Sequence, residues 1–284
     1  MSAKQWDRVV TGLLWGAGLL IIGVLALFLG HILFKGLPVL SASFIFGPSS
    51  DVSAGGGVGA QLFNTFYILF LSLLVAAPVA VGAGIYLAEY SARGRLADLI
   101  RLSVECLASV PSIVLGLFGM ILFINLMGFG ISLGVGAMTL ALMNLPIIVR
   151  VTEETLKTVP REYREASLAL GATKWQTIAR VVLPAALPGI VTGITLTAGR
   201  AVGETAILIF TAGTTASRLI PDFSLAAGGE TLAVHMWYVM AIGLVPDRVD
   251  IANGTGALLI LVILTFNLIL ASSTKHLRKW LTGM

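Results

Sequence analysis

Charged residues are scarce in this sequence. They make up 11% of its 284 residues, whereas hydrophobic residues make up 57%. Soluble domains carry about 25% charged residues, and the apolar runs here are too long for the core of a soluble protein. The composition therefore predicts a membrane protein that crosses the bilayer several times.

Three further absences exclude classes of function. The single cysteine, Cys106, cannot form an intrachain disulfide and has no metal-ligand spacing around it, so no metal site is expected. The sequence has no glycine-rich, lysine-containing phosphate loop, so the chain cannot itself be an ATPase. The basic residues are scattered at the ends of apolar segments, which indicates a role in membrane topology and not nucleic-acid binding.

Six apolar stretches are long enough to span a bilayer as helices, which requires about 20 residues each. The uncharged region 106–149 is too long for one span, and Met127-Gly-Phe-Gly130 divides it into two. Pro111 and Pro146 are expected to start or kink these two helices. The predicted spans are 12–34, 64–87, 108–127, 131–149, 188–212 and 251–273.

The first predicted span and one shorter apolar segment each need a further interpretation. The stretch 11–30 follows two basic residues and exceeds the apolar part of a cleaved signal peptide, so an uncleaved signal anchor is expected. The segment 232–246 spans only about half a bilayer, and we interpret it as a short interfacial or re-entrant helix in an external loop, 213–250. Its His235 is expected to pack or to be solvated. The acidic residues expected outside, where they could contact an external protein, are Asp222, Glu230, Asp247 and Asp250.

Six spans place both termini on the same side of the membrane. Lysine and arginine are concentrated on that side, and the other side holds only Lys35, Arg218 and Arg248. Because cytoplasmic loops carry such an excess, the termini and the loop 150–187 are predicted to be cytoplasmic. The basic residues on the predicted cytoplasmic side are Lys4, Arg8, Arg93, Arg95, Arg101, Arg150, Lys157, Arg161, Arg164, Lys174, Arg180, Lys275, Arg278 and Lys279.

The sequence of the loop 150–187 predicts a helix–turn–helix. Pro160 suits the start of a first helix over 161–170, and Gly171 suits the left-handed position that ends it. Thr173 and Gln176 form a capping-box pattern for a second helix, which is expected to stop before Pro184. The apolar side chains Trp175, Ile178, Val181 and Val182 would form one face of the second helix. On physical grounds alone, this face could lie on lipid headgroups or on a partner protein.

A short pattern in this loop favours a protein partner. Glu165-Ala166-Ser167, then Gly171, then Leu183 and Pro184 resemble the EAA loop of ABC importer permeases. In that family the loop docks in a groove of the cytoplasmic ATPase subunit, so the resemblance implies this role for these residues. Ser167 stands where the pattern has alanine, and a valine replaces its isoleucine. A rigid helix pair between two spans can pass on movement as a rigid body.

Further segments carry a more specific resemblance over nearly the whole chain. They are Lys35-Gly-Leu-Pro38, Ile85-Tyr-Leu-Ala-Glu-Tyr90, Gly94-Arg-Leu-Ala97, Val110-Pro-Ser-Ile-Val114, Gly116-Leu-Phe-Gly119 and Gly199-Arg-Ala-Val-Gly-Glu-Thr-Ala206. Together they resemble the PstA-type permeases of phosphate importers, and the last two segments are the more telling for phosphate. The resemblance implies a heterodimer with a second, PstC-type permease, two copies of a PstB-type ATPase subunit, and an external PstS-type phosphate-binding protein.

Two charged residues stand within the predicted fifth span. Arg200 and Glu204 are four residues apart, so on a helix they share a face and can pair. Charge inside a span is costly and is usually functional, although a buried pair that only fixes helix packing is the alternative. We expect Arg200 to bind phosphate through its guanidinium fork. Glu204 would hold Arg200 in the empty site, or accept the proton that phosphate carries and sulfate lacks. Thr197 lies on the same stripe, with the small and polar residues Gly189, Gly193 and Thr211.

The sequence thus predicts an all-α, six-span permease of the type I ABC importer class, with the MetI-like fold and no cofactor. The substrate alternatives are other oxyanions, such as molybdate or sulfate. A membrane-embedded enzyme would need convergent nucleophile, base or metal-ligand groups in the spans, and no such set is found. A scaffold without transport is the third alternative.

Overall fold

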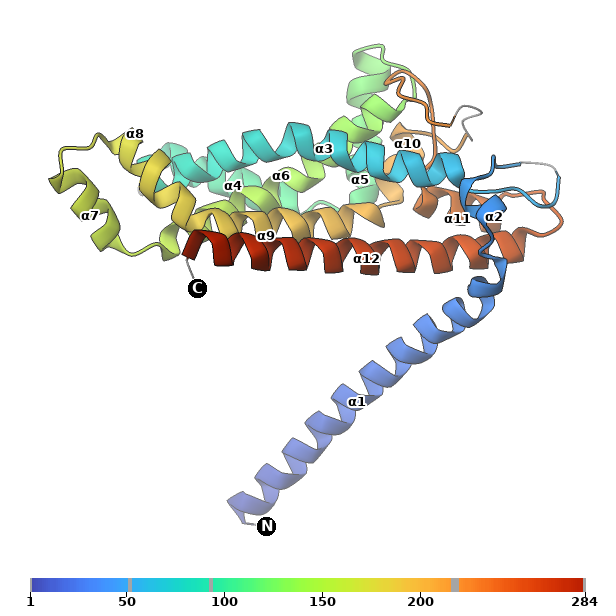
Figure 1. Cartoon of the computed structure of the whole chain (residues 1–284), viewed down its shortest axis with the longest axis horizontal. Helices are drawn as coiled ribbons and strands as arrows, with labels where there is room; N and C mark the ends of the chain where they lie inside the picture. Colours follow the sequence, from blue (N-terminus) through green and yellow to red (C-terminus); the bar gives the residue numbers. More distant parts are fainter. Residues whose placement is uncertain (1, 51–52, 92–93, 216–219, 283–284) are drawn as a thin grey trace.

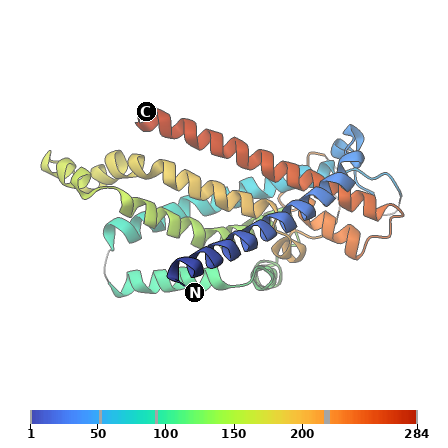
Figure 2. The same ribbon diagram turned by 90° about the horizontal axis from the view of Figure 1, so that it is seen from below.

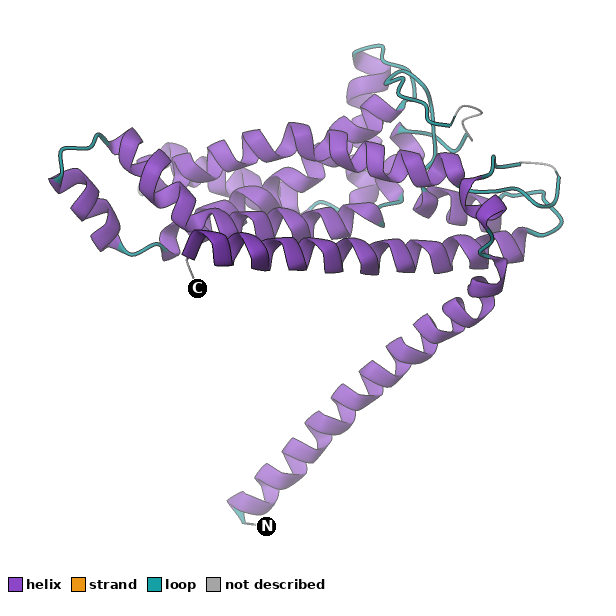
Figure 3. Cartoon of the chain, viewed as in Figure 1, coloured by secondary structure: helices purple, strands orange, loops and turns teal. Residues whose placement is uncertain are grey.

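The computed structural model describes residues 2–50, 53–91, 94–215 and 220–282. All regular structure in these ranges is helical, and they contain no strand (Figure 3). Five helices are long and apolar enough to cross a membrane, and a bent helix pair makes a sixth if it forms one span. The predicted all-α class is confirmed.

Four long helices form the centre of the molecule. They are α3 (Gly59–Ile85), α6 (Leu133–Thr158), α9 (Leu183–Val202) and α12 (Arg248–Thr282). α3 packs on α6, α6 on α9, and α9 on α12, so segments far apart in the sequence lie side by side (Figure 1).

The first helix diverges from this bundle. α1 (Ala3–Gly36) contains the predicted span 12–34 and extends beyond it at both ends. It meets α12 near its C-terminal end, where Gly36 lies against Asn253 and Ala257. The rest of α1 projects away, and its most apolar stretch has no residue buried within the chain (Figures 1 and 2).

Different elements lie at the two ends of the bundle. α7 (Arg161–Ala169) and α8 (Lys174–Thr177) lie at one end, which is also the end where α12 finishes (Figures 1 and 2). The short helices α2 (Ala42–Phe46) and α11 (Leu232–Ala241) lie at the other. We refer to these as the α7–α8 end and the α2–α11 end.

The region predicted as one helix over 108–127 is broken near its start. α4 (Arg95–Ser109) ends there, and α5 (Ser112–Gly119) continues into the π-helical stretch η3 (Met120–Leu126) at 103° to α4. Pro111 causes the break, because the residue before a proline avoids the helical conformation. The expectation that Pro111 starts a helix is confirmed, and the predicted range is corrected to begin at Ser112.

The helix predicted over 131–149 is longer than expected. α6 begins after Ser132, whose side chain caps it, and continues to Thr158, so the predicted loop 150–187 begins as helix. The extra turns carry the i,i+4 ion pairs Arg150–Glu154 and Glu153–Lys157, which stabilise a helix. The helix ends at Val159 because Pro160 follows.

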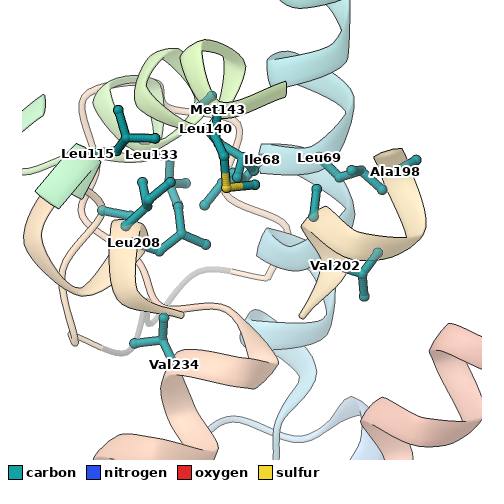
Figure 4. Packing of buried hydrophobic residues seen from close by; sticks show 14 residues of the cluster. Ile68, Leu69, Leu115, Leu133, Leu140, Met143, Ala198, Val202, Leu208 and Val234 are labelled. Atoms are coloured by element: carbon teal, nitrogen blue, oxygen red, sulfur yellow. The ribbon is translucent and has the colours of Figure 1, made fainter. Parts of the chain in front are cut away.

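The central core joins α3, α6 and α9 to the shorter helices. Ile68 and Leu69 of α3 meet Leu140 and Met143 of α6, and Ala198 of α9 completes the layer (Figure 4). Residues of α5, α10 (Ala206–Thr211) and α11 also enter this cluster. This core therefore connects α11, at the α2–α11 end, with α6 and α9, the helices that flank the α7–α8 loop in the chain.

Candidate functional site: the α7–α8 loop and the end of α9

The predicted helix–turn–helix is present. α7 begins directly after Pro160, and Gly171 turns the chain with a φ of +83°, in the left-handed region that favours glycine. The backbone N–H of Gln176 donates to Oγ1 of Thr173 (3.3 Å), and the N–H of Thr173 donates to Oε1 of Gln176 (2.8 Å). The predicted capping box at the start of α8 is therefore confirmed.

The residues of the Glu165-Ala166-Ser167 motif have different environments. Glu165 and Ala166 are exposed on α7, whereas Ser167 is half-buried. Oγ of Ser167 lies 2.9 Å from Oγ1 of Thr177, so a hydrogen bond joins the two arms of the loop. The serine that replaces alanine in the pattern thus stabilises the loop itself.

The sequence predicted that the apolar residues of the second helix form one face, but in the structure they do not. Ile178 and Val182 are buried, and Val182 packs against the end of α6, whereas Trp175 is 60% exposed. Leu170, at the turn, is 89% exposed. The loop is therefore fixed to the bundle on one side and presents an apolar surface on the other, at the tip of the molecule.

The second helix does not stop before Pro184. It runs from Lys174 through Val202 as one helix, and the π-helical stretch η4 (Ile178–Val182) directly precedes Leu183 and Pro184. A proline nitrogen cannot donate the usual helical hydrogen bond, and the wider π-helical turn changes the pairing locally so that the helix continues. Leu183 and Pro184 are half-buried at the start of α9 and do not lie in an exposed loop.

Sequence reasoning missed a cluster of ion pairs beneath the loop. Nη2 of Arg164 on α7 lies 2.6 Å from Oε1 of Glu89, although 75 residues separate them. The same guanidinium donates to the carbonyls of Leu156 and Val159 at the end of α6. Glu153 of α6 pairs with Arg101 of α4 at 3.0 Å. No spacing rule could pair these residues, because their partners come from separate helices.

The structure corrects the expected Arg200–Glu204 pair. α9 ends at Val202, and Glu204 lies in the break before α10, so the two residues do not share a helix face. Oε1 of Glu204 instead accepts a weak hydrogen bond from the backbone N–H of Ile207 (3.4 Å). α9 ends because Gly203 follows Val202, and glycine is a poor helix former. The predicted continuous helix over 188–212 is therefore wrong.

Arg200 is exposed at the end of α9 remote from α7 and α8. Among the described residues, its side chain forms no hydrogen bond or ion pair. Its guanidinium therefore has its donors free for a ligand or a partner subunit.

The small-residue stripe of α9 packs within this chain. A Cβ on Gly189 or Gly193 would collide with Thr155 or Val151 of α6, so these glycines permit close helix packing. Thr197 is 2% exposed, and its hydroxyl donates to the carbonyl of Gly193 (2.9 Å). In the described chain, this stripe forms a contact between α9 and α6.

A second polar cluster, near the α2–α11 end, corrects the placement of Glu230. The sequence suggested an external surface, but Glu230 is 1% exposed. Its Oε1 lies 2.7 Å from Nδ1 of His235 and accepts a hydrogen bond from Nε2 of Gln61 (2.8 Å). Of the two roles expected for His235, packing and solvation, the structure shows packing, because the residue is 3% exposed. No group of three or more His, Cys, Asp or Glu residues that could hold a metal ion occurs among the described residues.

Comparison with known families identifies the chain. Residues 80–283 match the family of binding-protein-dependent transport system inner membrane components. The chain belongs to this family. It is an ABC importer permease, and the ATPase activity of such systems lies in partner subunits.

Individual relatives agree with this assignment. A probable ABC transporter permease protein, YqgI of Bacillus subtilis, is 42% identical over 94% of this chain and 95% of its own length. The phosphate transport system permease protein PstA of Haemophilus influenzae is 37% identical over 75% of this chain and 72% of its own. PstA 1 of Mycobacterium tuberculosis is 44% identical over 56% of this chain and 52% of its own.

Solved structures share the fold. A chain of the MetNI methionine ABC transporter, in inward-facing conformations, superimposes with a TM-score of 0.61 at 25% identity, covering 78% of this chain and 94% of that one. A chain of a bacterial ABC transporter for the acidic polysaccharide alginate gives a TM-score of 0.67 at 15% identity, covering 96% and 99%. The expected MetI-like, type I importer architecture is confirmed.

Proposed function

We propose that this chain is the membrane permease of an ATP-driven phosphate importer. The relatives named as phosphate permeases support the substrate. The structural observation that carries the proposal is Arg200, an exposed guanidinium near the break between α9 and α10 with no partner among the described residues. Such a fork matches two oxygens of a phosphate ion.

The proposed path places Arg200 as the phosphate contact and Glu204 as a selectivity residue. Because Glu204 does not pair with Arg200, its remaining role is to accept a hydrogen bond from the proton on phosphate. Thr197 supports the same helix end from inside the bundle. A translocation path between this chain and a second permease fits the exposed position of Arg200, since the interior of the bundle is filled.

The proposed partners follow the phosphate systems: a PstC-type permease, two PstB-type ATPase subunits and a PstS-type binding protein. The exposed residues Glu165, Ala166 and Gly171, with the apolar side chains Leu170 and Trp175, would dock on the ATPase. Ser167, Leu183 and Pro184 would hold this surface in place. In this assignment the chain hydrolyses no ATP and needs no cofactor.

The proposed orientation puts the α7–α8 end in the cytoplasm. The C-terminal end of α12 lies at this end of the bundle in both views (Figures 1 and 2). Cytoplasmic termini agree with the excess of basic residues on that side. The α2–α11 end would then face the external binding protein.

Transport by the assembled complex tests this proposal. The chain is co-expressed with its partner permease and ATPase, reconstituted in proteoliposomes, and supplied with the binding protein and labelled phosphate. ATP-dependent uptake of phosphate that excess sulfate and molybdate do not suppress is the expected result. Uptake of sulfate or molybdate in preference to phosphate would assign the importer to that oxyanion instead.

A further inference from the structure

One short segment receives contacts from both arms of the α7–α8 loop. It is η2 (Tyr86–Tyr90), the π-helical turn that ends α3. Arg164 of α7 binds the carboxylate of Glu89 through Nη2 at 2.6 Å and Nε at 3.2 Å. Lys174 of α8 lies over the ring of Tyr90, with Nζ 4.6 Å from the ring centroid. A cation at this distance is attracted to the face of the ring.

The Glu89–Arg164 ion pair is largely buried, and additional hydrogen bonds hold it in place. The side chain of Glu89 is 8% exposed and that of Arg164 is 21% exposed. Arg164 also donates to the carbonyls of Leu156 (2.9 Å) and Val159 (2.8 Å), so its guanidinium joins α7, the end of α6 and η2. Charge-assisted bonds of this kind, shielded from water, are the stronger ones in proteins.

A pocket lies beside this ion pair. The pocket has a volume of about 570 Å³ and opens between the two elements, where Glu89, Arg164, Arg161 and Val159 line it. The Arg164–Glu89 ion pair at the edge of this pocket connects α7 to η2.

η2 is also held from its other side. Nη2 of Arg101, on α4, donates to the carbonyl of Leu87 at 3.3 Å, and the same guanidinium pairs with Glu153 of α6. The turn is thus fixed between α4 and α6 on one side and the α7–α8 loop on the other. π-helical turns are rare and often occur at functional sites.

We propose that η2 is the relay by which the α7–α8 loop moves α3, and that Glu89 is the positioning residue of this relay. The chain already joins the loop covalently to α6 and α9. α3 already packs along α6, and Glu89 and Tyr90 connect its last turn directly to the loop, so that a displacement of the loop reaches α3 without passing through α6. This inference rests on the proposed docking of the loop on an ATPase.

The test compares transport with ATP hydrolysis in the reconstituted complex. Glu89→Gln removes the charge and retains the shape, and Tyr90→Leu removes the ring, whereas Tyr90→Phe retains it. Glu154→Gln is the matched control, because it makes the same change in an exposed pair within α6. For each variant, three quantities are measured: the ATPase subunit that co-purifies, the thermal midpoint of the complex, and the substrate imported per ATP hydrolysed.

We expect the Glu89→Gln complex to keep its co-purified ATPase subunit and its thermal midpoint. It should import at least about fivefold less substrate per ATP hydrolysed, which is the lower end of the usual range for coupling between two sites. Tyr90→Leu should lower the same ratio, and Tyr90→Phe and Glu154→Gln should match the parent. An unchanged ratio in Glu89→Gln would overturn the relay, as would loss of the co-purified ATPase, which would assign Glu89 to docking.

Other results would also overturn the relay or the proposed function. If Glu89→Gln does not accumulate in the membrane, equal ratios for Tyr90→Leu and Tyr90→Phe overturn the relay. A parent complex that imports a different oxyanion refutes the proposed substrate, and the ratio is then measured with that anion. A parent complex that binds no ATPase refutes the proposed function and the relay together.

Discussion

Nδ1 of His235 lies 2.7 Å from Oε1 of Glu230, and the two side chains are 4% and 1% exposed. Gln61, near the start of α3, donates to the same carboxylate oxygen. Close by, the backbone N–H of Leu232 donates to Oγ1 of Thr65 (3.0 Å). The contacts hold the beginning of α11 against α3 and give Oε1 of the buried carboxylate two polar partners, whereas Oε2 has no hydrogen-bond partner among the described residues.

Replacing Glu230 should destabilise the α2–α11 end. Glu230→Gln weakens the bond to His235, and losing a buried bond to a charged group costs about 1.5–3 kcal/mol of unfolding free energy. A lower thermal midpoint of the detergent-solubilised protein is expected, whereas Glu154→Gln should change it only slightly, because an exposed ion pair contributes little. The double variant Glu230→Gln/His235→Gln should lose less than the sum of the single variants, because the two residues share one interaction. If the loss in the double variant equals the sum of the two single losses, Glu230 and His235 do not stabilise the protein through a shared interaction.

Much of the helical fold could be predicted from the sequence, because apolar length and local signals determine it. Pro111, Gly171 and the Thr173–Gln176 box act within a few residues of themselves, and each is found where the pattern placed it. Helix ends were harder to predict. The continuation of α6 to Thr158 depends on charged i,i+4 pairs, and the passage of the second helix through Pro184 depends on a π-helical turn.

The candidate site could be predicted only in its local parts. The resemblance around Glu165 identified the loop, but not its attachment, because Arg164 and Glu89 meet only after α3 and α7 are folded. The spacing of Arg200 and Glu204 suggested a pair, and the break after Val202 removed the helix that this argument required. Burial of Glu230 could not be predicted, since its partner Gln61 lies on another helix.

Arg200→Lys should reduce phosphate uptake. Lysine keeps the charge, but it is a single point donor and cannot present the planar fork that matches two phosphate oxygens. The loss of one charge-assisted hydrogen bond corresponds to roughly a tenfold decrease in uptake rate at low phosphate. Arg150→Lys, on the exposed end of α6, is the matched control and should transport like the parent. Equal uptake by Arg200→Lys and the parent would argue against a bidentate contact.

Glu204→Gln should weaken the discrimination between phosphate and sulfate. A carboxylate accepts a hydrogen bond from protonated phosphate and repels an anion that has no proton to donate, whereas the amide of glutamine can donate to either anion. Competition by sulfate against labelled phosphate should therefore become roughly tenfold stronger, the effect of one charged hydrogen bond. Unchanged phosphate uptake together with unchanged sulfate rejection would remove Glu204 from the path.

Gly171→Ala tests whether the turn between α7 and α8 couples the loop to the ATPase. The residue has a φ of +83° and open space around it, so a methyl group would meet no atom and the cost is that of the backbone conformation alone, about 1–2 kcal/mol. Gly128 offers a matched control, since it has a φ of +76° and equally open surroundings but lies in the loop between η3 and α6. Both alanine variants should lower the thermal midpoint by similar amounts. Only Gly171→Ala should reduce substrate-stimulated ATP hydrolysis, and a scaffold that does not transport would show no difference between the two.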